Sequence, residues 1–164
     1  MKKNNQGFSL VELIVIIALM AILVGGVLGY SNTYGGTKVK KCVNELDSIF
    51  SQTKVCAMSK TQAYMIIYAD NTGVYVKTVE GSISETRKIG EKGLTVKYRN
   101  TRTGSTYTAI GTTEATGLKI EFDRASGACK KMADNKYCYA IQISNGNATY
   151  TVNIEPLTGK TSIS

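Results

Sequence analysis

Histidine is absent from this sequence of 164 residues, and so is tryptophan. Without an imidazole, the chain cannot build a Ser-His-Asp triad, a histidine general base or a histidine-ligated zinc site. The sequence also has no nucleophile elbow, phosphate-binding loop, HExxH motif or clustered acids that would suit a metal. We therefore expect a protein that is not an enzyme and that uses no metal or other cofactor.

Acidic residues are also in the minority, because 20 Lys+Arg stand against 12 Asp+Glu, for a formal net charge of +8. Such a surplus suggests contact with an acidic partner, such as nucleic acid, anionic lipid or an acidic protein. The length suits one domain that is large enough to bury a core but too short for two such domains.

Polar side chains are scarce in residues 8–30, where the only conventionally polar ones are Ser9 and Glu12. A helix of about 20 apolar residues crosses the ~30 Å hydrocarbon layer of a membrane, so this run is long enough to span. Lys2 and Lys3 precede the run and no positive cluster follows it immediately. That asymmetry predicts an N-terminus in the cytoplasm and a remainder outside it.

Three interpretations of this apolar run are open, and they differ in whether they account for Glu12. A secretory signal peptide has a shorter apolar region of about 7–15 residues and a small-residue cleavage site, which residues 27–29 do not provide. A plain membrane anchor fits the length but leaves Glu12 unexplained, because an acid deep in lipid costs about 2.5–3.5 kcal/mol. The third interpretation is a specialised anchor that needs this glutamate.

The residues around Glu12 also form a known pattern. Residues 7–13 read GFSLVEL after a short basic leader, and they closely resemble the class III signal of bacterial type IV pilins and pseudopilins. The resemblance implies that a prepilin peptidase cleaves between Gly7 and Phe8 on the cytoplasmic side and methylates the new amino terminus of Phe8. Residues 1–7 would then be the leader peptide, and residues 8–30 a transmembrane helix that later enters the core of a filament.

The same resemblance implies a role for Glu12 in filament assembly, where its partner is the positively charged N-terminus of a neighbouring subunit. A wrong stagger would leave both charges unpaired, so the pair would set the register. The sequence departs from many major pilins at Gly29, where they carry a helix-kinking proline. Gly25, Gly26 and Gly29 either let the helix bend when the subunit moves into the fibre, or permit close helix packing.

A second helical pattern follows the apolar run. Residues 31–37, SNTYGGT, form a polar patch that we expect to loosen or briefly break the helix. From Lys38 the apolar residues recur at helical spacing, which predicts an amphipathic stem helix over residues 31–60 whose apolar stripe packs on a head. The predicted stripe comprises Val39, Cys42, Val43, Leu46, Ile49, Phe50, Thr53, Cys56 and Ala57.

Residues 61–164 show a period of two and predict a β-rich globular head. Expected strands are Tyr64–Ala69, Gly73–Val79, Leu94–Tyr98, Leu118–Phe122, Tyr139–Ile143, Tyr150–Ile154 and a short one near Thr161–Ser164. An Asn145-Gly146 turn predicts a hairpin, and we expect Glu80–Gly93 and Thr101–Gly117 to be loops or short strands. The fold class is therefore α+β: a long helix, first hydrophobic and then amphipathic, packed on one antiparallel sheet that is open or folded into two.

The head is similar in its element order to minor pilins and pseudopilins of the FimT/GspH type. The features that carry this similarity are the strand pair directly after the stem, the run Ile120-Glu121-Phe122-Asp123 with Gly127, and a closing hairpin that ends at Gly159. Such minor pilins are associated with DNA capture.

Four cysteines leave several pairings open. Cys42 and Cys56 are 14 residues apart, or about 21 Å along one helix, which is too far for a disulfide. Cys129 and Cys138 flank a short basic loop, and many pilins close a C-terminal loop with a disulfide. The alternative is that all four are thiols, with the helix cysteines acting as small core residues.

Positive charge gathers near the same loop. From Lys38 onward the chain holds 18 basic and 11 acidic residues, a net +7. A second basic group, Lys97, Arg99 and Arg102, lies near one strand. The group around the loop, called here the basic-loop cluster, is a candidate contact for DNA or another anion, and it is otherwise a solvated face or a docking surface for acidic neighbours. The basic-loop cluster comprises Arg124, Lys130, Lys131 and Lys136.

These patterns together predict a subunit, minor pilin or pseudopilin, of a type IV pilus or of a related type II secretion or competence pseudopilus. Its expected partners are prepilin peptidase, other pilin subunits, an inner-membrane assembly platform, membrane lipid before assembly, and DNA if the basic-loop cluster binds it. It is expected first as a single-pass protein of the cytoplasmic membrane and then in an extracellular or periplasmic filament. The alternatives are a membrane-anchored DNA-binding receptor of a DNA-uptake system and a secreted soluble binding module.

Overall fold

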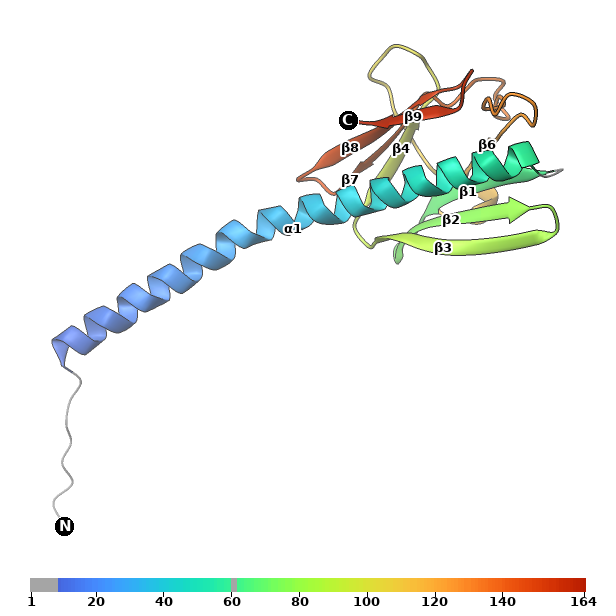
Figure 1. The fold of residues 1–164 in the computed structure, drawn as a ribbon. Coiled ribbons are helices and arrows are strands. Elements are labelled where there is room, and N and C mark those ends of the chain that lie inside the picture. Colours follow the sequence, from blue (N-terminus) through green and yellow to red (C-terminus); the bar gives the residue numbers. More distant parts are fainter. Residues whose placement is uncertain (1–8, 60–61) are drawn as a thin grey trace. The chain divides into compact units, whose positions relative to one another are not determined.

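The computed structural model describes residues 9–59 and 62–164, with residues 24–35 described by their backbone only. The fold is α+β, as predicted, and its elements are shown in Figure 1. The chain divides into two compact units, Met1–Tyr34 and Gly35–Ser164, which are taken in turn below.

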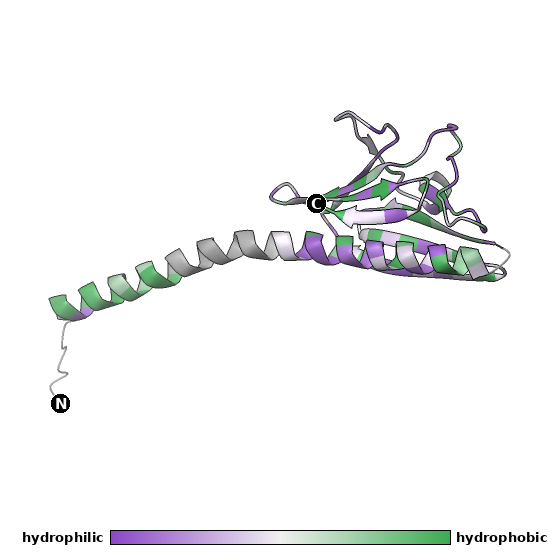
Figure 2. Cartoon of the chain, turned by 45° about the horizontal axis from the view of Figure 1, so that its top comes forward, coloured by the Kyte–Doolittle hydropathy of each residue, from purple (hydrophilic) through white to green (hydrophobic). Residues whose placement is uncertain are grey.

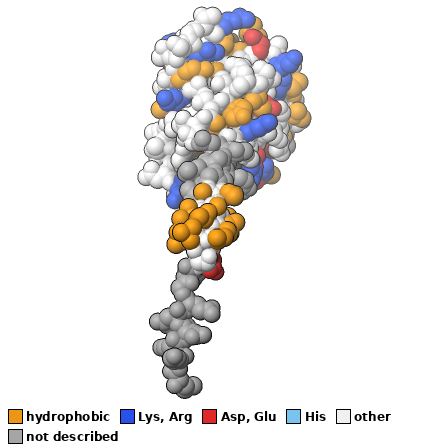
Figure 3. Space-filling model, turned by 90° about the vertical axis from the view of Figure 1, so that its left-hand side faces the viewer, with side chains coloured by type: hydrophobic (Ala, Val, Ile, Leu, Met, Phe, Trp, Pro, Cys, Tyr) orange, Lys and Arg blue, Asp and Glu red, His pale blue; other side chains and the backbone are white. Residues whose placement is uncertain are grey.

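Helix α1 covers Leu10–Ser59. It includes residues 31–37 without interruption, so the expected break at the polar patch is not observed. In the first unit, the described side chains of α1 are almost all apolar and exposed, as the hydropathy colours of Figure 2 and the space-filling view of Figure 3 show. Over the residues that the structure describes, no helix meets the combined length and hydropathy criteria for a membrane span.

In the second unit, α1 turns its apolar stripe inward. The members of the predicted stripe are buried except Cys56, which is half-buried. Thr53 is the buried polar member, and its hydroxyl donates a hydrogen bond to the Ile49 carbonyl at 2.8 Å, which satisfies it within the helix. The ring of Phe50 meets Phe122 edge to face, with centroids 4.9 Å apart. The helical period of the sequence therefore identified the buried face correctly.

The strands of the head form two antiparallel sheets, which is the second of the two arrangements expected from the sequence. The first has the order β3-β2-β1-β6 and the second the order β5-β4-β7-β8-β9. The first comprises β1 (Ala63–Ala69), β2 (Gly73–Glu80), β3 (Ile83–Glu91) and β6 (Leu118–Glu121). The second comprises β4 (Thr95–Arg99), β5 (Thr108–Ala109), β7 (Ala140–Ser144), β8 (Thr149–Glu155) and β9 (Lys160–Ile163).

Strand β3 is the main correction to the expected strands. Residues 80–93 were expected to be loop or short strand, yet they contain this nine-residue strand, which pairs with β2 along its whole length. Residues 83–88 are exposed on both faces because β3 lies at the edge of its sheet, so no apolar alternation marks them in the sequence. Residues 101–117 likewise contain β5 and a 3-10 helix, η1, over Glu114–Thr116.

The predicted hairpin at Asn145-Gly146 is confirmed between β7 and β8. Ser144 pairs with Thr149, and the Asn145 side-chain oxygen accepts hydrogen bonds from the backbone N–H groups of Asn147 and Ala148. Gly146 has φ +87°, a conformation that glycine adopts at little cost.

Candidate functional site

Glu12 lies in the first turn of α1, at the start of the described chain. The backbone N–H groups of Glu12 and Leu13 donate to the Ser9 carbonyl at 3.0 and 3.2 Å, so the helix is already formed here. A carboxylate is favoured at this end of a helix because the helix dipole is positive there. Among the residues that the structure describes, Glu12 has no ion-pair partner, so its charge is available to a group outside them.

The helix around Glu12 presents eleven large apolar side chains, each between 45% and 75% exposed. They are Leu10, Val11, Leu13, Ile14, Val15, Ile16, Ile17, Leu19, Met20, Ile22 and Leu23. Because they occupy nearly consecutive positions, they surround the helix instead of forming one stripe. An apolar surface of this extent needs cover, from lipid or from other helices, and Glu12 then needs a positive partner within it.

The structure describes the other residues of the predicted N-terminal segment only in part. Gly7 and Phe8, the predicted cleavage and methylation positions, lie outside the described residues. Gly25, Gly26 and Gly29 lie within α1, whose backbone stays helical through them. Their proposed part in bending the helix remains a prediction.

The basic-loop cluster lies on the segment between β6 and β7, and all four of its members are exposed. Acids lie among them. Lys130 is 3.8 Å from the Glu121 carboxylate, and the backbone N–H of Lys136 donates to Asp134 at 3.0 Å. Lys131 lies over the Tyr137 ring at 5.8 Å. The second basic group is also partly engaged: Arg99 donates to the Gly104 carbonyl at 2.9 Å, and Arg102 lies 3.7 Å from Glu155. The surface is therefore positive but interrupted, and its binding to DNA remains a prediction.

Cys129 and Cys138, which flank this loop, are both buried thiols in the structure. Burial raises the pKa of each to about 12. The pairing of Cys129 with Cys138 remains a prediction for an oxidising environment.

Lys54 makes a contact that the sequence did not predict. Lys54 is not a member of the predicted apolar stripe, yet its ammonium donates to the carbonyls of Thr158 and Gly159 at 2.7 and 3.1 Å. Its side chain also packs against Gly127. The helix thereby holds the turn between β8 and β9 against the loop that follows β6. No local sequence signal marks this contact, because its partners are more than 100 residues away.

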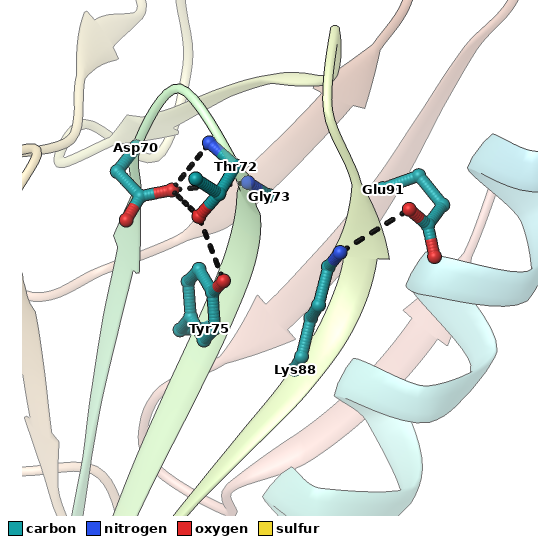
Figure 4. A network of polar contacts seen from close by, with 6 residues as sticks. All are labelled: Asp70, Thr72, Gly73, Tyr75, Lys88 and Glu91. Atoms are coloured by element: carbon teal, nitrogen blue, oxygen red, sulfur yellow. Dashed lines mark hydrogen bonds and ion pairs between the residues drawn. The ribbon is translucent and has the colours of Figure 1, made fainter.

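A polar network occupies the turn between β1 and β2 (Figure 4). One Asp70 oxygen accepts hydrogen bonds from the Thr72 N–H at 2.7 Å, the Thr72 hydroxyl at 2.5 Å and the Gly73 N–H at 3.0 Å. These bonds hold the pKa of Asp70 below its usual value, with the Thr72 hydroxyl bond contributing most. The Thr72 hydroxyl also lies 2.8 Å from that of Tyr75. The donors are all local, so the network fixes the turn.

Comparison with known protein families finds a match for the N-terminal segment that contains the predicted signal. Residues 2–28 match the family model of the prokaryotic N-terminal methylation motif. The motif indicates a type IV pilin-like substrate of prepilin peptidase, and it confirms the resemblance drawn from residues 7–13. No curated protein and no solved structure matches the chain. The similarity of the head to FimT/GspH-type minor pilins therefore remains a prediction.

Proposed function

We propose that this chain is a filament subunit, minor pilin or pseudopilin, of a type IV pilus or of a related type II secretion or competence pseudopilus. The methylation motif at residues 2–28 is the observation that carries the proposal. The exposed apolar side chains of α1 support it, because such a surface fits lipid before assembly and the packed helices of a filament core afterwards.

In this proposal, prepilin peptidase removes residues 1–7 and methylates the amino group of Phe8. The apolar helix keeps the subunit in the cytoplasmic membrane, with the head outside, until an assembly platform draws it into the growing fibre. The head carries no catalytic task in this scheme and gives the filament its surface chemistry.

Glu12 sets the register of assembly. Its carboxylate lies within an apolar surface and has no described partner, whereas processing creates a positive amino terminus on every subunit. Pairing of the two removes an uncompensated charge from the filament core, and a misplaced subunit leaves both charges unpaired. The pair therefore contributes more to specificity than to net stability.

Mass analysis of the mature N-terminus, in cells that produce prepilin peptidase, tests the processing step. A chain that begins with methylated Phe8 supports the proposal. A chain that begins beyond Tyr30 contradicts it and supports the secreted soluble module instead.

Filament incorporation of a Glu12→Gln variant tests the assembly step. We expect cleavage and membrane insertion to persist, while incorporation falls by more than about tenfold, because breaking a buried ion pair is strongly destabilising. Glu85→Gln is the matched control, since Glu85 is an exposed glutamate on edge strand β3 of the head. Equal incorporation of both variants would refute the register argument.

A further inference from the structure

A group of lysines gathers at the end of the head where α1 enters it. Three of them lie on α1, in the first turns that belong to the second unit. Of the other two, one lies near the end of β3 and one follows β3 directly. We call them the base lysines: Lys38, Lys40, Lys41, Lys88 and Lys92.

The packing of α1 against β3 holds two parts of this group together. Lys38, Lys41 and Lys88 line one groove of about 110 Å³, together with Glu45 and Glu91. A Cβ built on Gly90 would lie 2.8 Å from the Cys42 sulfur, so helix and strand are in close contact here. The groove is thus a fixed feature of the head, and its lysines come from both α1 and β3.

Acids near the base lysines do not cancel them. Glu45 lies 3.9 Å from Lys41, which is 76% exposed, and Glu91 lies 3.2 Å from Lys88. Asp70 is the third acid at this end, and its bonded carboxylate oxygen is occupied by the turn (Figure 4). Five positive charges therefore face three negative ones. Within the described residues, Lys38, Lys40 and Lys92 have no ion-pair partner.

Chain length brings these lysines close to the proposed membrane anchor. Lys38 follows Tyr30, the last residue of the apolar run, by eight positions. At ~1.5 Å per residue in a helix, this is about 12 Å. The headgroup layer adds roughly 5–8 Å to each side of the hydrocarbon core, and charges act over a Debye length of about 8–10 Å. A lysine at this position is within reach of the headgroups.

We propose that the base lysines bind the phosphates of anionic phospholipids in the outer leaflet of the membrane that holds the anchor. The inference rests on the proposed function, because it needs the apolar helix to be in that membrane. Lysine suits this partner, because its compact charge on a flexible stem can follow mobile headgroups without fixed geometry. Each lysine near an anionic surface strengthens the association by about fivefold. The base of the head thereby stays on the leaflet until the subunit leaves it.

Lysine footprinting of the full chain in vesicles tests the inference. The protein is reconstituted into vesicles of phosphatidylcholine alone or with one third phosphatidylglycerol, treated briefly with an acetylating reagent and analysed by mass spectrometry. We expect acetylation of Lys38, Lys41 and Lys88 to fall severalfold in the anionic vesicles and to recover in high salt, which shortens the Debye length. The basic-loop cluster provides internal control lysines, whose acetylation should be equal in both vesicles.

A triple variant and two competitors complete the test. Lys38→Gln, Lys41→Gln and Lys88→Gln together should abolish the protection of Lys40 and Lys92 in anionic vesicles, whereas Lys130→Gln with Lys131→Gln should preserve it. Protection by inorganic phosphate alone, or equal protection by duplex DNA in neutral vesicles, would overturn the assignment to lipid.

Vesicle flotation separates this inference from the function on which it rests. A chain that floats with both vesicles but shows no difference in acetylation overturns the lipid contact and leaves the membrane anchor intact. A chain that floats with neither overturns the anchor, and the inference with it.

Discussion

Gly159 provides the sharpest test of the packing between α1 and the end of the head. It has φ +57°, in the left-handed region, and a Cβ built on it would lie 2.2 Å from the Gly127 carbonyl oxygen and 3.3 Å from the Lys54 side chain. Gly159→Ala therefore has two costs. The backbone conformation costs about 1–2 kcal/mol for a residue with a Cβ, and relief of the clash costs about 1–3 kcal/mol more, as for an overpacked core.

Gly81→Ala isolates the first of these costs. Gly81 has φ +64°, almost the same conformation, but no atom lies within 4 Å of the position of its Cβ. We expect Gly81→Ala to lower the free energy of unfolding by about 1–2 kcal/mol and Gly159→Ala to lower it by about 2–5 kcal/mol. The difference between the two variants measures the crowding alone.

Urea unfolding of residues 35–164, followed by circular dichroism, measures both variants. This segment suits the assay because all buried core residues among those described lie between Val39 and Ile154. Equal destabilisation by the two substitutions would refute the crowding argument. If Gly159→Ala does not fold, Lys54→Met provides a second measurement. Its loss of the two carbonyl contacts should destabilise the head by about 1–3 kcal/mol.

Three further outcomes are expected. The buried thiols of Cys42, Cys129 and Cys138 have pKa values raised to about 12 from 9.0. Iodoacetamide at pH 8 should therefore modify them about a thousandfold more slowly than an ordinary thiol. Rapid labelling of the folded, reduced protein would contradict their burial. Hydrogen bonds from neighbouring groups lower the pKa values of Asp70, Asp123 and Asp134 below 3.8. Their contribution to stability is therefore fully present above pH 3.8 and is lost as the pH falls through the lower folded values. In an acid titration, the folded protein should lose less stability when all three are replaced by asparagine. If the basic-loop cluster binds DNA, its affinity for DNA should fall steeply as the salt concentration rises. The slope of log affinity against log salt concentration should become less steep when its lysines are replaced by glutamine. Salt-independent or absent binding would exclude the DNA-binding receptor.

Patterns that repeat locally were predictable from the sequence. The apolar stripe of α1 was identified because its burial follows the helical period, and the hairpin was identified because Asn145-Gly146 suits a tight turn. The signal at residues 7–13 was recognisable because its residue types lie at adjacent positions. In each case a short stretch of chain holds all the information.

Features that depend on distant partners were not predictable. Strand β3 has exposed, largely polar residues on both faces over most of its length, so its pairing with β2 left no hydrophobic alternation to read. Lys54 lies outside the predicted apolar stripe, and only the fold shows the turn whose carbonyls it contacts. The sequence left open whether the strands form one open sheet or two, because strand partners follow from tertiary packing instead of local pattern.

The order of the strands has a consequence for how the head folds. Strand β1 pairs with β6, and β4 pairs with β7, so both sheets join segments about 40 to 60 residues apart in the chain. Because β7 and β8 supply Ile141, Ile143, Val152 and Ile154 to the core, the core of the head cannot close until nearly the whole chain is available to fold. Until then the apolar stripe of α1 is uncovered. The interval before the core closes is therefore when this chain is most exposed to aggregation and proteolysis.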